Sequence, residues 1–170
     1  MSAPEFSRRF DVRQTEGKQV TLTASEPERA ALAARFGLVR IDRLEARAVL
    51  GRDGEAVEAE GRLEADIVQT CAVSGEDLPV AVDEPLALRF VPQGSVDHSE
   101  EEIELDAEES DEIEYSGSEF DLGEAVAQSL VLAIDPFATG PQADEARRRA
   151  GLQGEGEAGP FGALKGLFKD

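Results

Sequence analysis

The chain has 170 residues, 41% of them apolar, so it can build one domain with a hydrophobic core but is too short for two ordinary domains. Its formal net charge of -20 argues against broad binding of phosphate backbones or anionic lipid, both of which repel so negative a chain, and favours a basic partner. The single cysteine excludes an intramolecular disulfide framework, and no apolar run nears the roughly 18 residues that span a bilayer, so we expect a cytoplasmic protein that does not bind membranes.

Two short strands are expected near the N-terminus, at residues 6–12 and 18–24. In the second segment, Val20, Leu22 and Ala24 share one parity. This alternation is typical of a strand that buries one face and leaves the other in water. Both segments are therefore expected to belong to a sheet.

A short helix is expected next, at residues 30–36. Ser25 precedes Glu28 by three residues and Pro27 stands in the first turn, which is the pattern of a capping box. In such a box the two side chains satisfy backbone N–H groups at the start of the helix. Gly37 can end the helix, because glycine adopts the left-handed conformation that follows many helices.

The pattern then becomes that of strands from residue 39 to residue 91. The clearest signal lies at residues 57–67, where small and apolar residues alternate with charged ones. An earlier strand, up to Leu50, changes parity, which predicts a β-bulge near Asp42 or Arg43. Apolar residues alternate again at 78–90. We interpret this region as an antiparallel meander.

An acidic segment follows the strands. Residues 96–124 contain 14 acidic residues and no Lys or Arg, and most of residues 97–114 is expected to be a solvated loop. Ile113 and Tyr115 could form a short strand at its end. Two interpretations of the acids stay open: they aid solubility, or they mimic a polyanion and hold a basic protein by salt-screened attraction.

The best helix pattern begins after Asp121, an expected N-cap with Glu124 three residues later. Apolar residues recur at helical spacing from there until Asp135 and Pro136 stop the helix. Beyond it, residues 143–150 could form a short basic helix, and the glycine-rich stretch that follows is typical of a flexible linker.

Taken together, these patterns predict the α+β class: an antiparallel β-sheet meander of about five or six strands, two or three helices and a flexible C-terminal tail. Residues 1–136 are expected to form a single domain with an acidic loop at about 96–114. Residues 137–159 are expected to form a short helix and a flexible linker. Residues 160–170 form a short apolar and basic segment, in which Phe161 and Leu164 could line one side of a helical turn.

No catalytic constellation can be assembled from this sequence. His98 is the only histidine and lies among acids, with nothing to orient its second nitrogen. Structural zinc needs about four Cys or His ligands, and the chain has one of each. No glycine-rich phosphate-binding loop is present. We therefore expect a protein that is not an enzyme and uses neither a cofactor nor a metal. Cys71, which has no cationic neighbour in the sequence to lower its pKa, is best interpreted as a small half-buried residue.

The order of several segments resembles the YceD family, the bacterial large ribosomal RNA subunit accumulation proteins, in the form typical of alphaproteobacteria. The segments are DIVQTC at 66–71, LRFVP at 88–92, an acidic stretch, and FDLGE at 120–124, which opens the apolar helix. The resemblance runs from about residue 6 to residue 136, and PFGALK at 160–165 is similar to tails in that branch. The residues that carry the family motif are Cys71, Asp121, Leu122 and Gly123.

This resemblance implies a role in the accumulation or processing of 23S ribosomal RNA and in assembly of the large ribosomal subunit. Many members have a second cysteine three residues after the first, but this chain has Ser74 there, so metal binding does not carry over. We expect the acids and the C-terminal segment to bind a basic ribosomal protein or assembly factor, with any contact to RNA indirect. The candidate partner-binding residues are Glu100, Glu101, Glu102, Glu104, Asp106, Glu108, Glu109, Asp111, Glu112, Phe161, Leu164, Leu167 and Phe168.

An alternative function is direct RNA binding by the basic N-terminal portion. Arginines on one strand face could contact phosphates, but here they are interleaved with acids and lack aromatic residues that would stack on bases. The arginines concerned are Arg8, Arg9, Arg13, Arg40, Arg43 and Arg47.

Overall fold

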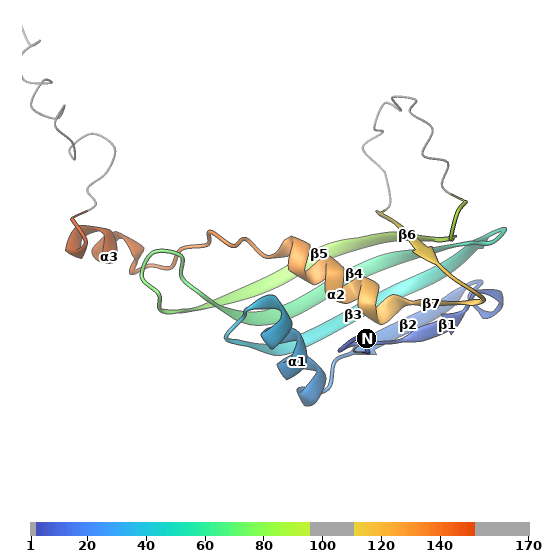
Figure 1. Ribbon diagram of the computed structural model, residues 1–170, viewed down its shortest axis with the longest axis horizontal. Coiled ribbons are helices and arrows are strands. Elements are labelled where there is room, and N and C mark those ends of the chain that lie inside the picture. Colours follow the sequence, from blue (N-terminus) through green and yellow to red (C-terminus); the bar gives the residue numbers. More distant parts are fainter. Residues whose placement is uncertain (1–2, 96–110, 152–170) are drawn as a thin grey trace, which may run out of the picture. The chain divides into compact units, whose positions relative to one another are not determined.

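The computed structural model describes residues 3–95 and 111–151, which form an α+β fold as the sequence predicts (Figure 1). No helix among these residues has the length and apolar character needed to cross a membrane. The elements in chain order are β1 (Arg9–Asp11), the short 3-10 turn η1 (Val12–Gln14), β2 (Lys18–Thr23), α1 (Glu26–Phe36), β3 (Arg40–Asp53), β4 (Ala56–Thr70), β5 (Asp77–Pro92), β6 (Asp111–Tyr115), β7 (Glu119–Asp121), α2 (Leu122–Ala133) and α3 (Ala143–Arg149).

The main sheet has five strands in the order β2-β3-β4-β5-β6. Its first four strands are neighbours in chain order, which confirms the predicted meander. The pairs β2–β3 and β3–β4 are antiparallel, and the register of β3 with β4 shifts between Ile41 and Arg43. The predicted bulge therefore lies where the parity of the apolar residues changes, and it keeps Ile41 and Leu44 on the buried face.

Strand β6 runs parallel to β5, which departs from a purely antiparallel sheet. Phe90 pairs with Ile113 in this register. Parallel neighbours need a long connection, and the chain between Pro92 and Asp111 is long enough to bring it back to the same end of the sheet. The short strand expected at Ile113 and Tyr115 is present, and it begins at Asp111, inside the segment that the sequence analysis treats as mostly loop.

The first strand does not join the main sheet. β1 instead pairs antiparallel with β7, so that Phe10 lies opposite Phe120 in a separate two-stranded sheet. The centroids of these two rings are 6.0 Å apart, and the Phe120 ring also lies 4.5 Å from that of Phe90. Stacking of aromatic rings thus ties the N-terminal segment to the chain just before α2.

Helices α1 and α2 pack on one face of the five-stranded sheet (Figure 1). From the helices, Leu32 and Leu130 are fully buried, and they belong to the same core as Leu44, Leu63 and Ile67 of the strands. Burying a Leu or Ile side chain stabilises the fold by about 1.5–3 kcal/mol. The opposite face of the sheet is lined by charged side chains and by the half-exposed Val49.

A second compact unit comprises Thr70–Leu78 and the described residues from Asp135 onward; the first unit holds the rest. Within the second unit, the backbone N–H of Ala72 donates to the carbonyl of Ala138 at 3.1 Å. Its helix, α3, spans nearly the residues where a short basic helix is expected, and three arginines occupy its last turn. Those cations suit the negative end of the helix dipole.

Candidate functional site

Two of the predicted partner-binding residues lie within the described part of the chain, Asp111 and Glu112, both on β6. The carboxylate of Glu112 is 4.0 Å from the Arg89 guanidinium, which also contacts Glu58 at 2.5 Å and Asp53 at 3.1 Å. Glu112 is therefore partly neutralised by a shared cation. The others lie outside the described residues: Glu100, Glu101, Glu102, Glu104, Asp106, Glu108, Glu109, Phe161, Leu164, Leu167 and Phe168.

A pocket of about 380 Å³ opens beside β6, where β6, β7 and the first turns of α2 meet. Its floor is apolar: Phe90, Phe120 and Ala125 line it, and each is at most 2% exposed. Its wall includes Ile113 and Tyr115 of β6. The pocket thus combines a buried apolar floor with a lining that is otherwise mostly polar.

The rim of this pocket is acidic. Glu114 and Glu119 line it and are exposed, and neither side chain makes a hydrogen bond or an ion pair with any other residue that the structure describes. Arg9 is the one cation among the lining residues and is likewise without a carboxylate partner in the described ranges. The pocket is therefore lined by two carboxylates and one cation that have no ion-pair partner among the described residues.

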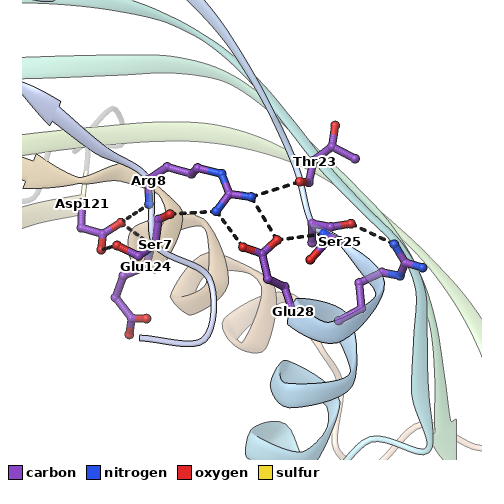
Figure 2. A network of polar contacts seen from close by, with 9 residues as sticks. Ser7, Arg8, Thr23, Ser25, Glu28, Asp121 and Glu124 are labelled. Atoms are coloured by element: carbon purple, nitrogen blue, oxygen red, sulfur yellow. Dashed lines mark hydrogen bonds and ion pairs between the residues drawn. The ribbon is translucent and has the colours of Figure 1, made fainter. Parts of the chain in front are cut away.

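The remaining two carboxylates of the rim are committed to other groups. Asp121 is the N-cap of α2, as predicted: one oxygen accepts from the backbone N–H of Glu124 at 3.1 Å and of Arg8 at 2.8 Å (Figure 2). Its other oxygen accepts from the hydroxyl of Ser7 at 2.5 Å. Glu124 pairs with Arg35 of α1 at 2.8 Å, which lowers the pKa of its carboxyl.

Gly123 and Leu122 of the family motif also hold the start of α2 against the N-terminal segment, and we call this contact the joint. Gly123 lies so close to the N-terminal segment that a Cβ there would be 2.6 Å from the carbonyl oxygen of Phe6 and 2.7 Å from the nitrogen of Arg8. Leu122 is buried in the core. The motif Asp121, Leu122 and Gly123 therefore fixes the start of α2 against residues 6–8, which is a structural role.

Arg8 extends the joint to α1. Its guanidinium makes two contacts with the carboxylate of Glu28, at 2.7 and 3.0 Å, and a third bond to the carbonyl of Thr23 (Figure 2). Glu28 and Ser25 form the predicted capping box, with the Ser25 N–H donating to Glu28 at 2.8 Å. The hydrogen bonds from Arg8, together with those from Ser25, lower the pKa of Glu28 to about 2.

Cys71, the fourth motif residue, lies in the second unit. It is 3% exposed, and its sulfur accepts from the backbone N–H groups of Ser74 at 3.4 Å and Gly140 at 3.3 Å. A hydrogen bond from the Ser74 side chain, followed by backbone donors, lowers the pKa of the thiol to about 6. Hydrogen-bond donors, and not a cationic neighbour, therefore lower the pKa of Cys71, which is buried and not half-buried as expected. The described residues contain no cluster of three or more His, Cys, Asp or Glu placed to hold a metal ion.

The arginines proposed for RNA binding are mostly engaged by carboxylates. Four of the six make ion pairs, and these lie within single strands, between neighbouring strands or at the start of α1. Such pairs cancel the positive potential that would attract phosphates. The pairs are Arg8–Glu28, Arg40–Asp42, Arg43–Asp66 and Arg47–Glu45, while Arg9 and Arg13 have no such partner within residues 3–95 and 111–151.

Comparison with protein families tests the family resemblance that the sequence indicates. The family model described as Large ribosomal RNA subunit accumulation protein YceD matches residues 59–168, well over half of the chain. The chain belongs to the YceD family. The match confirms the resemblance to the family and begins in β4, so it includes Cys71, the acidic segment, strands β6 and β7 beside the pocket, and the Asp121 motif. No curated protein and no solved structure matches the chain.

The YceD family description, an accumulation protein of the large ribosomal RNA subunit, implies a role in the accumulation of that RNA. The residues that carry the resemblance at the start of α2 turn out to hold the fold together. The pocket that lies beside them was not predicted. In the sequence, an apolar residue stands next to an acid at Ile113–Glu114 and again at Glu119–Phe120. These two pairs come close together only through long-range strand pairing, which a local pattern does not reveal.

Proposed function

We propose that this YceD-family protein is a non-enzymatic accessory factor, working in the cytoplasm, that holds a basic ribosomal protein or assembly factor while 23S ribosomal RNA accumulates and the large subunit assembles. The family role supports the process. The charge supports the kind of partner, since a chain of net charge -20 attracts cationic proteins and repels bare RNA. Contact with RNA would then be indirect.

One observation carries this proposal: some acidic groups on the described surface are paired with a cation and others are not. On the outer face of the sheet, several acids are neutralised by arginines, as in Arg43–Asp66, although Glu60 on that face has no such partner in the described ranges. At the end of the acidic segment, by contrast, Glu114 and Glu119 have no cationic partner among the described residues. Uncommitted carboxylates next to a segment rich in acids create a local negative field, which speeds association with a basic protein and weakens as salt rises.

The C-terminal segment would supply a second contact. In sequence, Phe161, Leu164, Leu167 and Phe168 are apolar, and a glycine-rich stretch separates them from α3. Two weak contacts on one chain raise the effective concentration of each for the same partner. Apolar anchoring would also keep some affinity at salt concentrations that screen the acids.

A pull-down with purified components tests the proposal. The basic proteins extracted from the large ribosomal subunit of the same cells are passed over the immobilised whole chain at about 50 mM and about 500 mM salt, concentrations that differ several-fold in screening length. We expect selective retention of one or a few basic proteins at low salt. A variant with the nine candidate acids at 100–112 changed to amides should retain far less.

A second variant, ending at Gly159, isolates the apolar contact, because it should bind at low salt and lose most of the binding that survives at high salt. Undiminished retention by the neutralised variant would reject the electrostatic part of the proposal.

A further inference from the structure

The pocket at β6, β7 and α2 has the chemistry of a receptor for one long basic side chain. Its wall contains the half-buried side chains of Ile113 and Tyr115, whose apolar surface can cover an aliphatic stem. Its rim carries the carboxylates of Glu114 and Glu119 in water, where a charged head remains solvated. Arginine and lysine side chains have this division into an apolar stem and a charged head.

The aromatic ring of Tyr115 favours arginine over lysine. Tyr115 lines the pocket and is only half-buried, and a planar guanidinium can both stack on an aromatic ring and bond to carboxylates at its edge. The protein already uses this combination elsewhere: the guanidinium of Arg8 lies 4.7 Å from the centre of the Phe6 ring while it binds Glu28.

The positive charge already at the pocket is insufficient to neutralise the rim. Arg35 is the partner of Glu124, and the hydrogen bonds of Asp121 are filled by Ser7, Arg8 and the helix start. Arg9 alone remains for two carboxylates. An added cation would therefore neutralise the pocket, and it would compete with Arg9 for the carboxylates of Glu114 and Glu119.

We propose that this pocket binds an arginine side chain of a basic protein segment, with Glu114 and Glu119 as its carboxylate partners and Arg9 as its internal competitor. The proposal rests on the proposed function, for which it names a point of contact. It also makes Arg9, one of the arginines considered for RNA binding, a residue that opposes binding of the partner.

The test uses the full chain and a fluorescein-labelled peptide of about twelve residues in which arginines alternate with glycine and alanine, followed by fluorescence anisotropy at about 50 mM salt, where screening is weak. A matched peptide has citrulline at each arginine, which keeps the shape and removes the charge. The pocket variant is Glu114→Gln with Glu119→Gln. The charge-matched control is Glu16→Gln with Glu60→Gln, two exposed acids outside the pocket.

We expect the pocket variant to bind the arginine peptide about three- to tenfold more weakly, the usual range for two solvent-exposed ion pairs. The control variant should bind within about twofold of the unaltered chain, since only the distant field changes. Arg9→Ala should bind more tightly than the unaltered chain, a gain that damage to the fold would not produce. The citrulline peptide should show no saturable binding.

Equal weakening in the pocket and control variants, or no gain with Arg9→Ala, would overturn the pocket proposal while leaving a basic partner for the acidic surface as a whole. Failure of the unaltered chain to bind the arginine peptide at all would overturn the pocket proposal too, and the pull-down with ribosomal proteins then decides separately whether the proposed function stands. Circular dichroism of each variant establishes that the comparison is between folded proteins.

Discussion

The carboxylate of Asp121 illustrates how one residue can have a role that its sequence neighbourhood reveals only in part. A cap at the start of α2 follows from local spacing, because the side chain of an N-cap reaches the backbone three residues later. The bonds from Ser7 and Arg8 join residues more than a hundred positions apart. No local pattern contains them, so the sequence could predict the cap and not the joint.

Replacing Asp121 should therefore cost more than the loss of a helix cap. Asp121→Ala removes the acceptor for three donors, two of them backbone N–H groups, and we expect the free energy of unfolding to fall by about 2–3 kcal/mol. Urea denaturation followed by circular dichroism measures this. Asp42→Ala, which removes the exposed partner of Arg40, should cost less than about 1 kcal/mol. Equal losses in the two variants would show that Asp121 is only a cap of ordinary strength.

Gly61 is a second residue whose importance is invisible in a strand pattern. It lies opposite Ala48, and a Cβ at this position would come 1.8 Å from the carbonyl oxygen of Arg47 and 2.7 Å from the Cα of Ala48. Because those atoms belong to the backbone of β3, Gly61→Ala must push β3 and β4 apart. We expect a loss of more than about 3 kcal/mol in stability, measured by thermal unfolding.

Gly51→Ala is the matched control for that experiment. Gly51 is also in β3, but nothing lies within 4 Å of where its Cβ would be. A strand gains from replacing glycine there, since alanine has less conformational freedom to lose, so we expect no loss of stability. A similar, small effect at both positions would contradict the close approach of the two strands at Gly61.

At the scale of elements, the parts that follow local rules were predictable and the parts that depend on distant pairing were not. The alternation in β4, the bulge in β3 and the capping box of α1 follow from parity and spacing within a few residues. The pairing of β1 with β7 and the parallel direction of β6 depend on how segments far apart in the sequence pack their apolar side chains into the core. Many arrangements of short strands satisfy the same local pattern, so the pocket that lies between them could not be predicted either.

The joint between the N-terminal segment and α1 has a definite dependence on pH. The pKa of Glu28 is about 2, below its ordinary value of 4.5, because Arg8 binds the ionised carboxylate. A depressed pKa in the folded state stabilises the protein above the unfolded pKa, and this contribution is lost as pH falls from about 4.5 toward 2. Glu28→Gln should lower stability by about 1 kcal/mol near neutral pH, a modest figure because the pair is partly exposed.

The difference between Glu28→Gln and the unaltered chain should shrink through that acid range, as urea titrations at a series of pH values would measure. Glu26→Gln, in the same helical turn but without an ion pair to any residue that the structure describes, serves as control and should change little at any pH. A constant difference for Glu28→Gln down to the lowest pH would contradict the assignment.

The turn that holds Cys71 makes a separate prediction. Because the chain has one cysteine, the ultraviolet absorbance of the thiolate reports on it alone. We expect a titration midpoint near 6 in the folded protein, and Ser74→Ala should raise it toward the ordinary value of 9.0 by removing the largest cause of the shift. A midpoint unchanged by this substitution would show that the backbone donors suffice without the serine hydroxyl.

At the scale of the whole molecule, the proposed function depends on how charge is distributed over the protein surface. Arginines and acids pair off across the outer face of the sheet and at the joints between helices, as in Arg35–Glu124. Glu114 and Glu119, which have no cationic partner among the described residues, lie close to the point where β6 follows the acidic segment. Composition alone predicts an acidic protein and a basic partner; only the structure separates the acids that hold the fold from those free to bind.

The most direct test of this account places the purified full chain in a choice between two partners, 23S ribosomal RNA and the basic proteins extracted from the large subunit. Binding to each is measured by analytical ultracentrifugation at about 50 mM and about 500 mM salt. The account predicts a complex with a basic protein that weakens at high salt, and none with RNA alone. A stable complex with bare RNA, or cleavage of it, together with indifference to the basic proteins, would contradict the central claim.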